Sequence, residues 1–319
     1  MGVAVPGRVV SLLPAATEIV CALGAEAALV GVSHECDFPE SVRGVPVLTS
    51  SRLDATAGSL AIDRAVRELV RDALSLYSVD ERALAAAAPD LVITQDLCEV
   101  CAVSLDDVKS AVARLSRRDA VAIISLSPTR LEHVLGDFDR VAEALGVPEA
   151  GSLLRRRSEE RLRAISERAA AVAVRPRVLS VEWLEPLMLG GTWMPELIEL
   201  AGGIAVGASA GAPAPTLGLD ELRQLAPDVV LVKPCGFPLE RTLRERDFLV
   251  RELVPRLPAT TRVYVADGNA FFNRPGPRLV ESVEILAACI HPRLFDDFWH
   301  KHSPAAVIAA LGASGHQAR

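Results

Sequence analysis

The chain has 319 residues, of which 50% are hydrophobic and 24% charged, as is ordinary for a globular protein. Its formal net charge of −7 provides no basic surface, so we expect no nucleic-acid partner. Domains usually comprise about 100–200 residues, so this length allows two lobes, each with its own core.

The start of the chain carries no targeting signal. Residues 1–7 have neither the basic segment nor the apolar core of a secretory signal. As written, the chain is therefore expected in the cytoplasm, where its six cysteines would be mainly reduced. A start codon farther upstream would instead place the protein in the periplasm or at the cell surface. No apolar run approaches the ~20 residues of a membrane span, so we expect none.

Strand and helix signals alternate through the first 130 residues. Short apolar runs predict strands at 8–13, 29–32, 46–48, 90–94 and 120–126. Helical spacing of apolar residues predicts helices at 17–24, 63–76, 80–88 and 105–115. Such alternation is typical of a parallel sheet with helices on its faces.

Strand signals stop between residues 131 and 173, where we predict two helices, at 131–145 and 148–172. In the second helix, Leu154, Leu162 and Ile165 follow a helical period, while the basic triplet at 155–157 supplies a solvated face. At ~1.5 Å per residue this helix could span roughly 35 Å. We interpret it as a rigid strut between two lobes.

After the strut the earlier pattern is repeated. Residues 177–181 resemble the first strand, and 222–232 repeat the Pro-Asp-strand order of 84–94. The predicted fold is therefore α/β, with two Rossmann-like parallel-sheet lobes joined by one long rigid helix and a ligand cleft between the lobes. We assign residues 1–130 to the N-terminal lobe, 131–174 to the helical linker, 175–300 to the C-terminal lobe and 301–319 to a tail.

Candidate ligand-binding residues of the first lobe follow its predicted strands, because crevices open at the carboxyl ends of parallel strands. They are Pro14, Ala15, Thr17, His34, Glu35, Cys36, Phe38, Gln95, Asp96 and Cys98. If the strands at 29–32 and 90–94 are neighbours, the loops that follow them converge on one rim.

Three of these side chains, together with Cys101, suggest a metal site. His34, Cys36, Cys98 and Cys101 could bind zinc or an iron–sulfur cluster, since the two-residue spacing lets both later sulfurs reach one ion. Cys235 could approach from the other lobe. A redox pair or plain reduced thiols explain the same cysteines equally well.

Aromatic and polar residues follow the strands of the second lobe. The candidates are Trp183, Trp193, Lys233, Cys235, Phe237, Asn269, Phe272 and Arg274. Aromatic walls with a few polar groups suit a flat, amphipathic small ligand. The alternative is that these aromatic side chains belong to the core of the lobe.

Enzyme signatures are missing from the sequence. It contains no Gly-x-Gly-x-x-Gly, no Walker loop and no Gly-x-Ser-x-Gly. Glu35 and Asp37 near His34 could act as acid and base, but acids in loops are more often solvated. We assign no catalytic residue and expect a protein that is not an enzyme.

Several stretches resemble the helical-backbone (class III) periplasmic-binding-protein family, the iron–siderophore and vitamin B12 substrate-binding proteins of ABC importers. The resemblance runs from about Arg8 to Pro292. It rests on 11–18 (SLLPAATE), 30–39 (VGVSHECDFP), 88–92 (APDLV), the strut and 197–203 (LIELAGG). The most similar subgroup is that of the cobalamin-binding proteins, of which 95–101 (QDLCEVC) looks characteristic.

This resemblance implies a monomeric binding protein that needs no cofactor. Its ligand would be cobalamin or another metal chelate held between the lobes, with His34 as candidate axial ligand to cobalt. The family docks on an ABC permease through an acid on each lobe. Glu199 matches the second of these acids by its place before Ala-Gly-Gly, and Asp106 is our candidate for the first.

A second hypothesis keeps the scaffold and changes the function. The chain would then be a cytoplasmic metal-binding, iron–sulfur or redox protein that uses His34, Cys36, Cys98 and Cys101. Metal content of the purified protein separates this hypothesis from the first.

Overall fold

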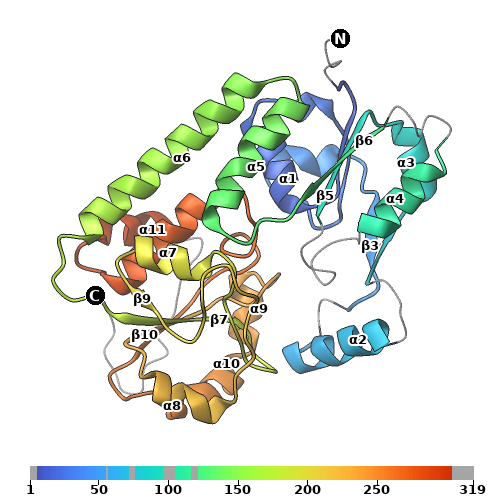
Figure 1. The fold of residues 1–319 in the computed structure, drawn as a ribbon. Coiled ribbons are helices and arrows are strands. Elements are labelled where there is room, and N and C mark those ends of the chain that lie inside the picture. The colour runs from blue at the N-terminus through green and yellow to red at the C-terminus, as the bar shows by residue number, and fades with distance from the viewer. Residues whose placement is uncertain (1–5, 55–56, 72–75, 96–104, 116–120, 304–319) are drawn as a thin grey trace. The chain divides into compact units, whose positions relative to one another are not determined.

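The computed structural model describes residues 6–54, 57–71, 76–95, 105–115 and 121–303 (Figure 1). It divides into two compact units. The first contains residues 1–57, 61–128 and 132–158, and the second contains 58–60, 129–131 and 159–319. The boundary falls within the long helix α6 (Pro148–Ala169), which contributes to both units. The structure thus has the long helix that the sequence predicts, ending three residues before the expected end.

The first unit is built on a parallel sheet with the strand order β2-β1-β5-β6. The strands are β1 (Val9–Ser11), β2 (Leu29–Val32), β5 (Leu91–Gln95) and β6 (Ala122–Leu126). The condition that β2 and β5 be neighbours is not met, because β1 lies between them and pairs with both. The carboxyl ends of β2 and β5 still lie at the same edge of the parallel sheet, about 10 Å apart at the usual strand spacing. A small antiparallel pair, β3 (Thr49–Ser51) and β4 (Tyr77–Val79), completes the strands described here.

Helices alternate with the strands of the first unit, as predicted. They are α1 (Pro14–Ala22), α2 (Ser59–Arg71), α3 (Glu81–Ala87), α4 (Leu105–Ala113) and α5 (Leu131–Ala144), with short turns η1 (Glu26–Ala28) and η2 (Glu40–Gly44). Helix α1 begins at Pro14, three residues before the prediction, because proline is favoured in a first helical turn. Asp80 caps α3 by accepting hydrogen bonds from two backbone N–H groups, at 2.9 Å each.

The second unit has its own sheet, with the strand order β11-β10-β7-β8 and β9 beside β7. The strands are β7 (Arg177–Trp183), β8 (Met188–Leu189), β9 (Ile204–Ala205), β10 (Val229–Val232) and β11 (Arg262–Val265). All pairings are parallel except that of β7 with β8. A parallel sheet in each unit confirms the α/β class.

The helices of the second unit surround this sheet. They are α7 (Met194–Leu200), α8 (Leu222–Leu225), α9 (Leu239–Arg244), α10 (Arg246–Phe248), α11 (Leu279–Ile290) and α12 (Asp296–His302), with η4 (Leu219–Glu221), η5 (Leu249–Leu253) and η6 (Val254–Arg256). Every residue of α11 except Glu281 is buried, so this helix forms part of the core. Glycine is required at Gly203, where a Cβ would lie 2.7 Å from Val178.

The repeated Pro-Asp signal occupies equivalent places in the two units. Ala88 and Ala226, which precede the two prolines, both adopt the left-handed conformation, with φ of 39° and 41°. The aspartates that follow, Asp90 and Asp228, each accept a backbone N–H from the start of the neighbouring strand. Those strands then pair in parallel, β5 with β1 and β10 with β7. The sequence repeat is therefore also a structural repeat.

Candidate ligand-binding site

The loops after β1 and β2 form the rim of the first unit, and their polar atoms are held together by hydrogen bonds. Thr17 is fully buried, with its Oγ1 2.8 Å from the Oγ of Ser11 and 3.1 Å from the Sγ of Cys36. Cys36 is itself buried, and its backbone N–H donates to the carbonyl of Ser33. Thr17 and Cys36 therefore stabilise the rim from inside.

His34 is oriented by Thr49, which the sequence did not indicate. Both the backbone N–H and the Nδ1 of His34 contact the Oγ1 of Thr49, at 3.0 and 2.7 Å. The hydroxyl of Thr49 donates its own proton to the Oγ of Ser33, 3.3 Å away. Since a hydroxyl has one proton, the bond to His34 uses a proton on Nδ1. Of the two tautomers of a neutral imidazole, this arrangement selects the one with a lone pair on Nε2.

The Nε2 of His34 is buried and has no hydrogen-bond partner among the described residues. It lies 3.4 Å from the Oε1 of Glu35, which is an ion-pair distance, but the two groups are not aligned for a hydrogen bond. The ring of Tyr77 lies 5.3 Å away, centroid to centroid. A neutral imidazole with an open Nε2 is a suitable ligand for a transition metal.

The predicted cysteine site cannot be completed from the described residues. Asp96, Cys98 and Cys101 lie outside them, and the described part of the chain contains no group of three or more His, Cys, Asp or Glu placed to hold a metal. Burial, with smaller effects of Glu26, Glu18 and Cys36, raises the pKa of the Cys21 thiol to about 12. Burial also raises the pKa of Cys289 to about 12. The Cys21 and Cys289 thiols therefore favour their protonated forms at neutral pH.

In the second unit, the loops after β7, β10 and β11 form what we call the second rim. Beneath it, the ammonium group of Lys233 donates to the Oε2 of Glu182 at 3.0 Å and to the Oδ1 of Asn273 at 2.7 Å. The amide of Asn273 donates in turn to the carbonyls of Lys233 and Gly268. The end of β7 and the segments that follow β10 and β11 are thereby joined by one largely buried polar network.

The aromatic side chains of the second rim are largely packed against one another. The indole N–H of Trp193 donates to the carbonyl of Phe272 at 2.8 Å, and both side chains are buried. Trp183 makes an edge contact with Phe237, and the guanidinium of Arg241 lies over the Phe237 ring, 4.4 Å from its centroid. This packing agrees better with a preformed wall than with loose loops.

The loop after β11 is also held by Asp267, which our prediction missed. Its carboxylate accepts the backbone N–H groups of Asn269 and Ala270 at 2.9 and 2.7 Å. Burial raises the pKa of Asp267, while these hydrogen bonds oppose the increase. An Asp-Gly-Asn turn signal at this position could have identified the residue.

Burial separates the predicted residues into two groups. Those with exposed or half-buried side chains remain candidates for ligand contact: Pro14, His34, Glu35, Phe38, Trp183, Cys235 and Asn269. Others are buried by protein atoms: Ala15, Thr17, Cys36, Gln95, Trp193, Lys233, Phe237, Phe272 and Arg274. The prediction that Thr17, Lys233 and Phe272 contact the ligand is wrong, because these side chains are fully buried and a side chain without exposed surface cannot touch a ligand. They support the rims instead.

The two candidate docking acids are both exposed. Glu199 lies in the last turn of α7, and the side chain of Asp106 in the first turn of α4 is 95% exposed, 3.8 Å from Lys109. Permease docking through them stays a prediction.

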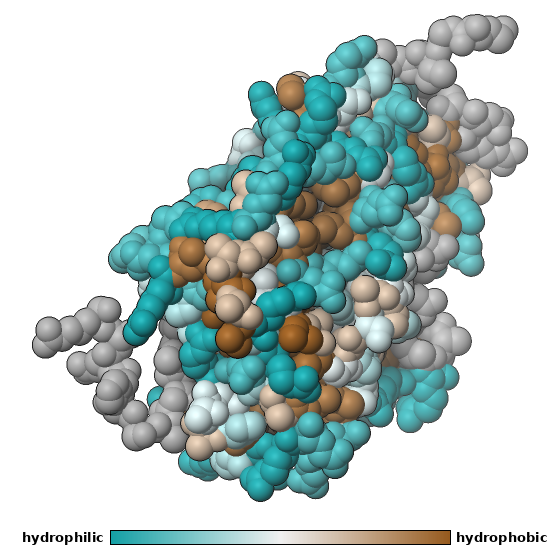
Figure 2. All heavy atoms as spheres, turned by 60° about the vertical axis from the view of Figure 1, so that its left-hand side comes forward, coloured by the Kyte–Doolittle hydropathy of each residue, from teal (hydrophilic) through white to brown (hydrophobic). Residues whose placement is uncertain are grey.

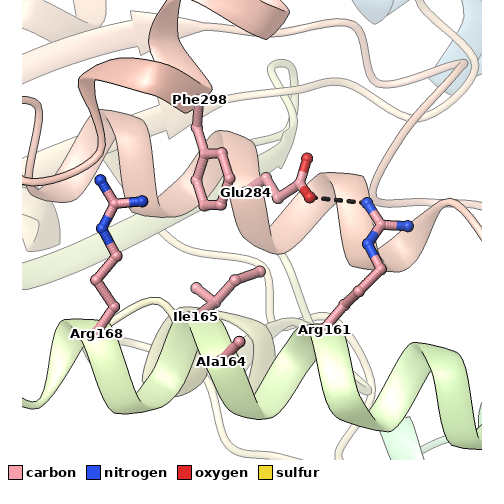
Figure 3. Close-up of a pocket in the computed structure, with 6 residues that line it drawn as sticks. All are labelled: Arg161, Ala164, Ile165, Arg168, Glu284 and Phe298. Atoms are coloured by element: carbon pink, nitrogen blue, oxygen red, sulfur yellow. Dashed lines mark hydrogen bonds and ion pairs between the residues drawn. The ribbon is translucent and has the colours of Figure 1, made fainter.

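One hollow of about 210 Å³ lies between α6, α11 and α12 of the second unit (Figure 3). It is lined by Arg161, Ala164, Ile165, Arg168, Glu284 and Phe298. Its charged groups are engaged with protein partners: Arg161 with Glu284 at 2.7 Å, and Arg168 with Asp297 at 2.6 Å. Figure 2 shows hydrophobic side chains reaching the surface in several places among hydrophilic ones, as is normal for folded proteins. Neither feature competes with the rims as a ligand site.

Comparison with known proteins points in one direction. A family model described as a periplasmic binding protein matches residues 9–270. Vitamin B12-binding proteins of Yersinia pestis (strain Pestoides F) and Yersinia pseudotuberculosis (serotype O:1b, strain IP 31758) are each 22% identical over 288 residues, which cover 88% of this chain and 84% of each relative.

Solved structures show the same fold. A periplasmic heme-binding protein from Pseudomonas aeruginosa has a TM-score of 0.68 at 21% identity, over 90% of this chain and 94% of that one. The periplasmic vitamin B12-binding protein of Vibrio cholerae has a TM-score of 0.64 at 18% identity, over 92% of this chain and 98% of that one.

Proposed function

The chain belongs to the periplasmic binding protein family, and we propose that it binds a metal chelate, with a corrinoid such as cobalamin as first candidate. Members of this family are binding proteins for transport, so the expectation that the chain is not an enzyme is confirmed. The relatives quoted above are named for vitamin B12 or heme, two flat metal-containing macrocycles. Their shared chemistry supports a ligand of that class.

The single observation in this chain that carries the proposal is the geometry of His34. Thr49 fixes the proton on Nδ1, which leaves the Nε2 lone pair available for a metal ion in a bound chelate. A second hydrogen bond that orients a histidine is the usual companion of metal ligation. Because Nε2 is buried, the Glu35 carboxylate, 3.4 Å away, would have to turn aside before a chelate could reach it.

We also propose that the protein delivers its ligand to an ABC permease through Glu199 and Asp106. The family is periplasmic, so the expectation of a cytoplasmic protein finds no support. Within the described ranges, no helix is long and apolar enough to cross a membrane.

Absorbance titration tests the proposal. Purified protein would be titrated with hydroxocobalamin, whose axial position exchanges, with cyanocobalamin, whose axial position exchanges poorly, with hemin and with a ferric siderophore. We expect saturable binding of at least one chelate and a spectral shift where the metal has an exchangeable position. No binding of any of them refutes the proposal.

Variants assign the shift to His34. His34→Ala should remove the spectral shift and weaken chelate binding. Thr49→Val should lower the affinity for the chelate about 10-fold or more, as the loss of a partner that orients a metal ligand usually does. His300→Ala, at an exposed side chain of α12, is the matched control and should leave both unchanged. Elemental analysis of the same preparations tests the zinc or iron–sulfur alternative, which requires stoichiometric metal without added chelate.

A further inference from the structure

A buried ion pair lies directly beneath the second rim. Lys233 follows β10 and has no exposed surface, while Glu182 lies near the carboxyl end of β7. Their charged groups are 3.0 Å apart, and the Oδ1 of Asn273 accepts a second hydrogen bond from the ammonium group. Lys233 therefore cannot touch a ligand, and its charge is balanced within the protein.

Glu182 differs from Lys233 because part of it reaches the surface. Its side chain is 25% exposed, and only Oε2 is used by Lys233. Among the described residues, no group donates a hydrogen bond to Oε1. An ionised carboxylate accepts several hydrogen bonds, so the described part of the second rim presents one carboxylate oxygen as an open acceptor. Lys233 holds that acceptor in place from below.

The arginines of the same rim are engaged elsewhere. Arg274 is buried and donates to the Oδ1 of Asn269 at 2.9 Å. The guanidinium of Arg241 lies over Phe237 and pairs with Glu245 at 3.3 Å. Arg278 lies over the ring of Phe271, 5.5 Å from its centroid. The described part of the rim thus offers an acceptor more readily than a cation.

We infer that Glu182, positioned by Lys233, determines ligand specificity by selecting chelates that carry hydrogen-bond donors over chelates that carry carboxylates. The inference rests on the proposed function and narrows its ligand class. A corrin ring bears side-chain amides, whose N–H groups can donate to Oε1, whereas the carboxylates of a porphyrin such as heme would meet a like charge. The rim chemistry therefore favours the amide-bearing corrinoid.

The test compares ligands that differ in one group. Affinities would be measured for cyanocobalamin, for its monocarboxylate derivatives, in which one side-chain amide is hydrolysed, and for hemin. We expect the wild-type protein to bind cyanocobalamin about tenfold more tightly than at least one monocarboxylate, as one close like-charge contact implies. Hemin should bind more weakly than cyanocobalamin.

Substitutions then assign the discrimination to Glu182. In Glu182→Gln, the affinities for cyanocobalamin and for the monocarboxylate should differ by no more than about threefold. Glu182→Asp, which keeps the charge, should retain part of the wild-type difference. Glu167→Gln removes the same charge from an exposed position of α6, which leads to the amino end of β7, and should preserve the preference. Since Glu182→Gln leaves a buried ammonium without its carboxylate, the wild-type protein supplies a second test: its preference should fall as salt is added.

The outcomes separate the two proposals. Equal affinity for amide and carboxylate ligands, tighter binding of hemin than of cyanocobalamin, or an unchanged preference in a folded Glu182→Gln variant overturns the specificity inference while leaving chelate binding in place. Failure to bind any corrinoid, porphyrin or ferric siderophore overturns the proposed function, and the inference with it.

Discussion

The buried carboxylate of Glu284 on α11 should make the second unit sensitive to acid. Its oxygens accept hydrogen bonds from Arg161 at 2.7 Å, from Lys301 at 2.6 Å and from His302 at 2.7 Å. Burial alone would raise the pKa of Glu284, but the bonds from His302, Lys301 and Arg161 outweigh it and lower the pKa from 4.5 to about 2. Helix α12 is thereby attached to α11 and α6.

The magnitude follows from this pKa difference. One pKa unit corresponds to about 1.4 kcal/mol, so ionised Glu284 contributes about 3 kcal/mol to the free energy of unfolding at neutral pH. Because the folded pKa is the lower one, the contribution is complete well above pH 4.5 and is lost as the pH falls toward 2. About 1 kcal/mol should be lost by pH 4 and about 2 kcal/mol by pH 3.

Glu284→Gln should therefore lower the free energy of unfolding by about 3 kcal/mol at pH 7 and by only about 1 kcal/mol at pH 3. Urea unfolding followed by tryptophan fluorescence is the suitable assay, because all three tryptophans, Trp183, Trp193 and Trp299, belong to the second unit. A difference in the free energy of unfolding between the two proteins that is the same at pH 7 and pH 3 would refute the reasoning.

Glu281→Gln provides the matched control for this experiment. Glu281 lies on the same helix and also accepts a hydrogen bond from Arg161, at 2.8 Å, but its side chain is 24% exposed. Solvent-exposed ion pairs usually contribute less than about 1 kcal/mol, so this variant should lose little stability at any pH.

Three further changes test the rims and a helix cap. Gly268→Ala would place a Cβ 2.1 Å from the carbonyl oxygen of Pro234, so the loop after β11 must move, and titration should show at least about tenfold weaker chelate binding. Trp193→Phe leaves the buried carbonyl of Phe272 without its donor and should cost about 1–3 kcal/mol in urea unfolding; no loss would mean that water replaces the indole. Asp80→Ala removes the cap of α3 and should cost about 1 kcal/mol, measured as thermal unfolding by circular dichroism, whereas Asp80→Asn should cost much less.

The sequence by itself determined the class of fold and most of its elements. The strand at Leu29–Val32 has its predicted bounds, and β5 begins within one residue of its predicted start. The duplicated Pro-Asp sequence indicated the two lobes. At each copy, a residue in the left-handed conformation ends a helix just before a buried strand, and this is a local structure. Such signals depend on neighbouring residues alone and can be recognised in one sequence.

Only the tertiary structure decided which strands are neighbours and which side chains meet. It placed β1 between β2 and β5, buried Lys233 beneath the second rim, and paired His34 with Thr49. Lys233 and its partner Glu182 are 51 positions apart in the sequence, and His34 and Thr49 are 15 positions apart. A hydrophobic period shows that a face is buried, but not what covers it, since burial and hydrogen bonding are set by residues that fold against it from elsewhere in the chain.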